Sequence, residues 1–525
     1  MKKIYTIALC LAFTFFAGAQ VEKYDKVKIF TNDSGLEKLA TLGIAVDHGE
    51  YKKSNYFISE FSESDINLMR KNGFTVDVLI SDMANFYVQR NKNLPKEEDM
   101  QIPGGCVHAT PKNFRLGTMG GFYTLEDMLA ILDTMRMKFP DLISVKKPAS
   151  SLTTAEGRKL YFVRISNHPD SLQKNKPKVL YTGLHHAREP ISLTELIMYM
   201  WYVMENYNKD ADITNIVNNT ELYFIPCINP DGYMYNETTN PNGGGFWRKN
   251  RRNNGDGSFG VDLNRNYGYQ WGRNNSGSSP STFSDTYRGP SAFSEPETQI
   301  VRDFCKKYNF KVAINNHSYS NVLVYPWGYA YNKLTKDSTT FTNYANTLTL
   351  CNGFHAGTAN QTVGYLANGT SDDWMYGEQT LKEKTFAMTP ETGSSNDGFW
   401  PAKNRIIPIC KKNLDMHIEA AKFATLIASP YANTITATQN KSLTVFQNAP
   451  NPCNRFTVIR FSLPASENNA VLNIFNATGA KIKSIALHNT SSINLDVSDL
   501  KAGIYYYNIS TAQRLSSMMK MVIVQ

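Results

Sequence analysis

Short apolar runs alternate with amphipathic stretches through the middle of this chain, from about residue 113 to residue 429. The clearest strand signals are the apolar runs at residues 179–184, 222–228, 312–315 and 385–388. Residues 191–207 carry a one-sided apolar stripe with helical spacing, and residues 406–427 are predicted to form a closing helix. Such alternation predicts an α/β domain, with a mostly parallel, mixed sheet that helices cover on both faces.

The rest of the 525 residues is predicted to form smaller units, since single cores stop growing near about 250–300 residues. Residues 1–19 have the Lys pair, apolar run and small residues of a secretory signal, and the run is too short to span a membrane. Residues 20–93 alternate strand-like and helix-like runs, which predicts a small α+β domain. Residues 94–112 are rich in Pro, Gly and charge, which predicts a linker that proteases can reach.

The last segment, residues 430–525, changes to Asn, Thr, Ser and β-branched residues in short alternating runs. Turn residues recur along it, so we predict a linker followed by a small β-sandwich. The net charge of +9 comes without a basic run or a base-stacking pattern, and we expect no nucleic-acid partner. The cysteines that remain after loss of Cys10 are either buried thiols or one or two disulfides, and we expect a monomer.

Residues with metal-binding chemistry follow two of the predicted strands. His186 and Glu189 come after residues 179–184, and His317 comes after residues 312–315. Ligands of open α/β sheets bind at the carboxyl ends of the strands. Two imidazoles and one carboxylate would leave one tetrahedral position for water, as at a catalytic zinc. His185 competes with His186, but only His186 has the three-residue step to Glu189.

Further motifs join this pattern in chain order. They are Trp247-Arg248-Lys249, Asp262-Leu263-Asn264-Arg265-Asn266, His317-Ser318-Tyr319, and Tyr365 ahead of Gly369-Thr370-Ser371-Asp372-Asp373-Trp374. Together these motifs resemble the zinc metallocarboxypeptidases of the carboxypeptidase A/B family. The resemblance implies one Zn²⁺ ion, and it implies that Asp262 orients a ligand histidine. The metal ligands that it implies are His186, Glu189 and His317.

The resemblance also implies the catalytic groups. Arg248 occupies the family position that stabilises the developing oxyanion. Glu391 is the carboxylate that takes the proton of the attacking water. Many members have an apolar residue immediately before this Glu, whereas this chain has Pro390.

A substrate site follows from the same resemblance. Arg265, with Asn264 beside it, matches the clamp for the substrate's terminal carboxylate, to which a guanidinium fork is well suited. Asp372 lies where an acidic residue favours Lys or Arg ends; the alternative is that it bonds backbone amides in a turn. Tyr365 matches the tyrosine that closes over the terminal residue. The other substrate-binding residues implied are Arg188, Ser318, Tyr319 and Phe399.

The flanking units carry resemblances of their own. The position of residues 20–93 resembles that of the activation segment of procarboxypeptidases; the alternative is an unrelated accessory domain. Residues 430–525 resemble the C-terminal sorting domain of type IX secretion cargo, and the alternative is a carbohydrate- or protein-binding sandwich. The motifs that carry this second resemblance are residues 448–452, 476–479, 500–506 and 520–524.

The sequence thus predicts a carboxypeptidase that is made as a proenzyme, exported through the periplasm, and secreted or held at the cell surface. Its expected partners are peptide or protein C-termini and the outer-membrane secretion machinery. Two alternatives stay open. The same fold could trim bacterial cell-wall peptides, or the chain could be a non-catalytic surface binding protein.

Overall fold

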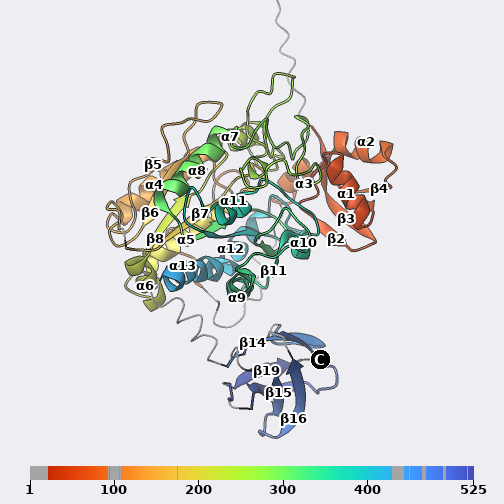
Figure 1. The fold of residues 1–525 in the computed structure, drawn as a ribbon, viewed down its shortest axis with the longest axis vertical. Helices are drawn as coiled ribbons and strands as arrows, with labels where there is room; N and C mark the ends of the chain where they lie inside the picture. The colour runs from red at the N-terminus through yellow and green to blue at the C-terminus, as the bar shows by residue number, and fades with distance from the viewer. Residues whose placement is uncertain are drawn as a thin grey trace, which may run out of the picture.

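In the computed structural model of the protein, a mixed sheet in the middle of the chain organises the fold (Figure 1). The structure describes residues 22–428 and 443–524, except residues 93, 95–105, 107, 174, 449, 464–466, 468, 489–491, 513 and 517. The predicted signal at residues 1–19 and most of the predicted linker at residues 94–112 lie outside this range. The sheet order is β11-β10-β12-β9-β7-β8-β6-β5. Its strands are β5 (Lys147–Pro148), β6 (Tyr161–Ile165), β7 (Lys178–Thr182), β8 (Glu221–Ile225), β9 (Val312–Asn315), β10 (Val322–Val324), β11 (His355–Gly357) and β12 (Phe386–Glu391).

The middle of this sheet is parallel and its edges are mixed. Strands β12, β9, β7 and β8 run parallel to one another, whereas β6 and β10 pair antiparallel with β8 and β12. Residues alternate between two cores: Val179 and Tyr181 face one cluster, and Leu180 faces the other. The predicted mixed sheet with helices on both faces is therefore confirmed.

The helices of this domain precede, separate and follow the strands of the sheet in sequence. They are α4 (Leu125–Lys138), α5 (Ile191–Asn206), α6 (Ala211–Asn219), α7 (Pro230–Thr239), η1 (Leu263–Arg265), α8 (Pro296–Tyr308), α9 (Ser338–Leu348), α10 (Ala359–Thr362), α11 (Ser371–Gly377), α12 (Lys403–Lys412) and α13 (Leu414–Ala428). The closing helix predicted at residues 406–427 is interrupted, because α12 ends at the cap residue Asn413. In the described part of the chain, no helix is both long and apolar enough to cross a membrane.

Residues 22–92 form an α+β unit, coloured red to orange in Figure 1, as predicted. Its sheet has the order β2-β3-β1-β4, with β1 in the centre pairing antiparallel with β3 and β4. Asn32 and Ser62 cap the N-termini of helices α1 and α2, and the side chain of each accepts a hydrogen bond from a backbone amide in the first turn. The elements are β1 (Tyr24–Phe30), α1 (Asp33–Thr41), β2 (Glu50–Lys52), β3 (Tyr56–Ser62), α2 (Glu63–Lys71), β4 (Val76–Ile80) and α3 (Met83–Gln89).

The C-terminal residues form an all-β unit, coloured blue in Figure 1. One sheet has the order β13-β14-β17 and the other the order β16-β15-β18-β19. Side chains of both sheets share one core, as Ile459 and Leu472 illustrate, so the predicted sandwich is confirmed. The strands are β13 (Thr444–Val445), β14 (Phe456–Ser462), β15 (Asn469–Asn476), β16 (Lys481–His488), β17 (Ser492–Asp496), β18 (Gly503–Ser510) and β19 (Met519–Ile523).

A disulfide joins Cys106, within the predicted linker, to Cys351 of the central domain. The other cysteines of the described residues are buried thiols, namely Cys227, Cys305, Cys410 and Cys453. The sequence does not decide between disulfides and buried thiols, and the described part of the chain contains both.

Candidate metal centre and substrate site

Three neighbouring parallel strands bring the predicted metal ligands to one edge of the sheet. Strand β7 leads into the loop that carries His186 and Glu189, β9 leads to His317, and β12 ends at Glu391. The amide of His317 donates to the carbonyl of Pro390, which fixes the loop after β9 against the end of β12. The site therefore lies where open α/β sheets bind their ligands.

The side chains of His186, Glu189 and His317 meet in a buried cluster. Nδ1 of His186 lies 2.7 Å from Oε1 of Glu189. Nδ1 of His317 lies 2.9 Å from Oε2 of Glu189 and 3.1 Å from Nδ1 of His186. Two ligands of one tetrahedral zinc ion stand about 3.4 Å apart, so a donor set of two nitrogens and a carboxylate at these spacings fits Zn²⁺.

The competitor His185 faces away from this cluster. Its Nε2 lies 2.9 Å from the hydroxyl of Tyr267, and its ring stacks on that of His317 at 5.3 Å between centroids. The geometry thus favours His186 over His185 as a metal ligand, as the spacing to Glu189 predicts.

Asp262 connects the cluster to the arginines of the site. Its Oδ1 lies 3.2 Å from Nε2 of His186, the ring nitrogen that faces away from Glu189. Its Oδ2 accepts hydrogen bonds from Nε and Nη2 of Arg248, at 3.1 and 2.9 Å. Burial would raise the pKa of Asp262, but Arg248 and His186 outweigh it and hold the pKa far below its usual range. A carboxylate on the second nitrogen fixes the orientation of a ligand histidine.

Glu391 lies beside the cluster with a protonation behaviour suited to proton transfer. Burial raises the pKa of its carboxyl to about 7. Its Oε2 has no hydrogen-bond partner among the described residues. A carboxylate with a pKa near the working pH can both accept and return a proton.

A loop of the N-terminal unit enters this site, which the sequence did not predict. Asp47 is buried there, and both of its oxygens accept hydrogen bonds from Arg248. Nη2 of Arg265 donates to Asp47 at 2.8 Å, and the hydroxyl of Tyr365 donates to the backbone carbonyl of Asp47 at 3.5 Å. Burial would raise the pKa of Asp47, but Arg248 and His48 outweigh it and hold the pKa well below its usual range.

The next residue, His48, reaches the predicted metal ligands. Its Nε2 lies 3.0 Å from Oε1 of Glu189 and 3.8 Å from Oε2 of Glu391. One potential ligand atom from each of His48, His186 and Glu189 lies within 4.8 Å of the others. No periodic pattern or motif in the sequence singles out this histidine, because its importance depends on how two separate units dock.

The other residues predicted to bind substrate line the same region. Arg188 donates to Asp285 at 3.0 Å and lies 4.4 Å over the ring of Phe399. The hydroxyl of Tyr319 donates to Glu60 of the N-terminal unit at 2.7 Å. The backbone amide of Ser318 donates to Glu189 at 3.2 Å.

Asp372 lies in the first turn of α11. The side chain of Asn264 accepts a hydrogen bond from the amide of Ser371 at 2.9 Å, which connects this turn to the site. Burial raises the pKa of the Asp372 carboxyl, against the opposing effect of hydrogen bonds from Thr370 and from the backbone amides of Asp372 and Asp373, so the alternative role as a turn residue that bonds backbone amides stays open. The amides of Gly328 and Tyr329 donate to the neighbouring Asp373, so in this turn Asp373 accepts backbone amides from another loop.

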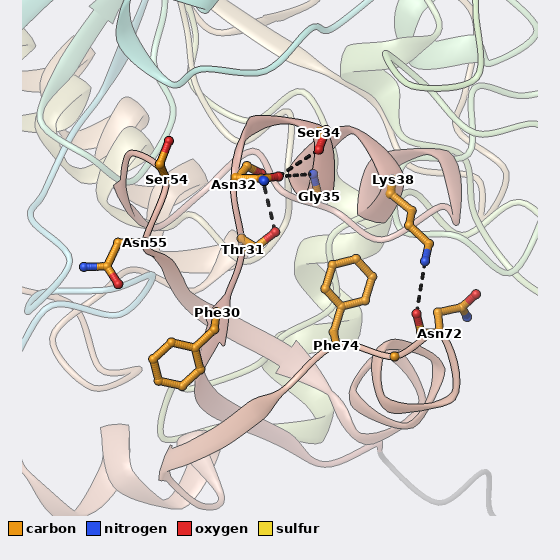
Figure 2. A pocket seen from close by; sticks show the side chains of 11 residues that line it. Phe30, Thr31, Asn32, Ser34, Gly35, Lys38, Ser54, Asn55, Asn72 and Phe74 are labelled. Carbon is orange, nitrogen blue, oxygen red and sulfur yellow. Dashed lines mark hydrogen bonds between the residues drawn. The ribbon is translucent and has the colours of Figure 1, made fainter.

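The described residues form hollows beside and on the N-terminal unit. One of about 370 Å³ lies beside Asp47 and His48, between this unit and residues that include Ser320 and Asn360. Another, of about 420 Å³, is formed by the N-terminal unit alone and is drawn in Figure 2. Its lining includes Asn32 and Lys38 but no residue predicted to bind metal or substrate, so it is separate from the site.

Comparison with known proteins agrees with this geometry. The family model described as zinc carboxypeptidase matches residues 128–416, and the model described as secretion system C-terminal sorting domain matches residues 449–525. Carboxypeptidase B of Astacus astacus is 34% identical over 297 residues, which are 55% of this chain and 91% of that protein. Carboxypeptidase A4 of Mus musculus is 32% identical over 324 residues, which are 60% of this chain and 72% of that protein.

Solved structures share the fold. Thrombin activatable fibrinolysis inhibitor matches with a TM-score of 0.58 at 22% identity, over 77% of this chain and 99% of that one. Carboxypeptidase A of Helicoverpa armigera matches with a TM-score of 0.60 at 20% identity, over 77% and 98%.

The fold and the buried cluster of imidazoles and carboxylate define a zinc metallopeptidase. The chain belongs to the zinc carboxypeptidase family, and Zn²⁺ is its cofactor. The sorting domain implies export by the type IX secretion machinery, to the cell surface or the medium.

Proposed function

We propose that the chain is a carboxypeptidase made as a proenzyme, exported through the periplasm, that removes C-terminal Lys or Arg from peptides as a monomer. The observation that carries this proposal is the approach of His186, Glu189 and His317 to within 2.7–3.1 Å of one another. Glu391 and a pair of arginines lie beside them. This combination suits hydrolysis of a peptide bond next to a free carboxylate.

The metal site and the catalytic residues have separate roles in this proposal. His186, Glu189 and His317 hold the Zn²⁺ ion, and Asp262 orients His186. When bound, the ion polarises the scissile carbonyl and makes water a usable nucleophile near neutral pH. Glu391 takes the proton of that water and returns it to the leaving amine, for which a pKa of about 7 is well suited.

Substrate binding depends on arginine. The forked guanidinium of Arg265 binds the terminal carboxylate of the peptide, and Tyr365 closes over the terminal residue, with Asn264 beside them. Arg248 stabilises the oxyanion that develops at the scissile carbonyl. Arg188 supports the peptide backbone upstream of the cut, in a region that Ser318, Tyr319 and Phe399 also line.

A preference for basic ends is assigned to Asp372. A buried carboxylate in the pocket for the terminal side chain pairs with Lys or Arg and rejects apolar ends. Two findings support this assignment: the burial of Asp372, and the 34% identity to a protein named carboxypeptidase B.

The proposed proenzyme follows the domain division of the sequence. Residues 1–19 are the signal, 20–93 the activation segment, 94–112 the linker, 113–429 the catalytic domain, and 430–525 the linker and sorting domain. Asp47 engages both Arg248 and Arg265, so a substrate carboxylate cannot bind until the activation segment leaves. Cleavage in the linker would release it.

A release profile of C-terminal residues tests this function. Linker-cleaved protein is given peptides that differ only in their last residue, with and without a chelator, at neutral pH. We expect zinc-dependent release of Lys and Arg. Asp372→Ile should lower kcat/KM for these ends roughly 150-fold, as loss of about 3 kcal/mol predicts, and raise release of apolar ends. Release that survives zinc removal would reject the metal mechanism, and wild-type release of apolar ends would reject the basic preference.

A further inference from the structure

His48 and Asp47 reproduce the arrangement of a ligand histidine and its supporting carboxylate. Nδ1 of His48 lies 2.8 Å from Oδ1 of Asp47, and Nε2 lies 3.0 Å from Oε1 of Glu189. An ionised carboxylate can only accept hydrogen bonds, so Nδ1 is the ring nitrogen that carries the hydrogen shared with Asp47. The other ring nitrogen, Nε2, then faces the metal cluster and is free to bind a metal ion.

The pair His186 and Asp262 has the same design within the catalytic domain. One ring nitrogen of His186 faces Glu189 and the other faces Asp262. Arg248 donates to both carboxylates, Asp262 and Asp47, and so joins the two pairs. A carboxylate on the second nitrogen is the usual support of a metal-bound histidine.

Nε2 of His48 is also a buried atom without a hydrogen bond. Among the described residues its nearest polar neighbours are two carboxylates, Glu189 at 3.0 Å and Glu391 at 3.8 Å, and neither is placed to form a hydrogen bond of good geometry with it. The imidazole is only 4% exposed, and it is enclosed by the rings of Phe399, Tyr319 and His186. Buried polar atoms are seldom left without a partner, so this nitrogen calls for one that the protein chain does not provide.

We infer that His48 supplies a further protein ligand, through Nε2, to the zinc ion of the uncleaved chain. The inference rests on the proposed function, because it uses the same zinc site. The N-terminal unit would then fill the coordination position that a catalytic zinc keeps for water. Asp47 would at the same time occupy the place of the substrate's terminal carboxylate. Two consecutive residues would then block both the metal position for water and the arginine that binds the carboxylate.

The coordination of zinc in the full, uncleaved chain tests this inference directly. X-ray absorption at the zinc edge should count three imidazoles in the wild type and two in His48→Gln. The linker-cleaved wild type, freed of its N-terminal unit, should also show two. The exposed His355 provides a matched control, and His355→Gln should keep three.

The rate at which zinc passes to a chromophoric chelator gives a second readout that does not depend on activity. We expect release from His48→Gln at least tenfold faster than from the wild type, and no change for His355→Gln. Two imidazoles in the uncleaved wild type, or equal release rates, would overturn the inference. If His48→Gln fails to fold, the comparison of uncleaved with cleaved wild type decides alone. A cleaved enzyme that neither binds zinc nor hydrolyses peptides would instead refute the proposed function.

Discussion

Replacement of Asp47 by Asn should weaken the closure of the active site by the N-terminal unit. The substitution keeps the volume of the side chain and one acceptor oxygen, but removes the negative charge. In the wild type this charge faces Arg248, Arg265 and the ring of His48. In the proposed proenzyme, Asp47 serves only the docked state, because the cleaved enzyme would no longer contain it.

The size of the effect follows from what each arginine retains. Removing one partner of a buried ion pair costs roughly 3–5 kcal/mol. Arg248 keeps its hydrogen bonds to Asp262, and Arg265 keeps the backbone oxygen of Asn264 at 2.9 Å. We therefore expect a loss of about 2–3 kcal/mol in docking, which is roughly 30–150-fold in the equilibrium between closed and open chains.

The assay is the peptidase activity of the uncleaved chain on a peptide with a C-terminal Arg. Asp47→Asn should raise this residual activity roughly 30–150-fold. After cleavage and separation, variant and wild type should have the same kcat/KM. Asp77→Asn, an exposed substitution on the same unit, is the matched control and should change neither value. An Asp47→Asn chain that folds and stays within twofold of wild-type residual activity would refute the argument.

Two further substitutions test other buried carboxyl groups. Glu391→Gln should lower kcat about 10²–10⁴-fold without loss of bound zinc, measured by turnover and metal analysis, because the proton acceptor is gone. Burial raises the pKa of Glu195 to about 8, so the folded state keeps a proton that the unfolded chain releases near pH 4.5. The stability of the wild type should therefore fall by a few kcal/mol as the pH rises from about 4.5 to 8. Glu195→Gln should remove this part of the decline, and equal pH dependence of thermal unfolding in both proteins would contradict it.

Most of the fold could be predicted because its determinants are local in the sequence. The apolar run at residues 312–315 coincides with β9, and the helical stripe from Ile191 coincides with α5 to within one residue. The prediction of one continuous closing helix is wrong at Asn413, whose side-chain amide donates hydrogen bonds to the buried Glu195 and Thr392. That polar contact joins distant segments, and no periodicity could indicate it.

The residues of the site likewise fall into those that the sequence could predict and those that it could not. The resemblance to the carboxypeptidase A/B family selected His186, His317 and Glu391, and the rule that ligands bind at the carboxyl ends of parallel strands predicted that these distant positions meet. Asp47 and His48 follow no strand of that sheet. They lie in a loop before β2, in a unit with a core of its own, and they meet the metal cluster only because two folded surfaces dock.

Charge balance explains why one pair of arginines can serve both the closed and the open protein. In the closed chain, Asp262 and Asp47 together neutralise Arg248, while Asp47 is the carboxylate that pairs with Arg265. Departure of the N-terminal unit leaves Asp262 in place but removes the partner of Arg265. A buried guanidinium without a counter-charge is costly, and the free carboxylate of a peptide restores the balance. In the proposed proenzyme, the N-terminal unit and the substrate would therefore compete for the same positive charge, so that inhibition before cleavage and binding of C-termini after it would have one physical cause.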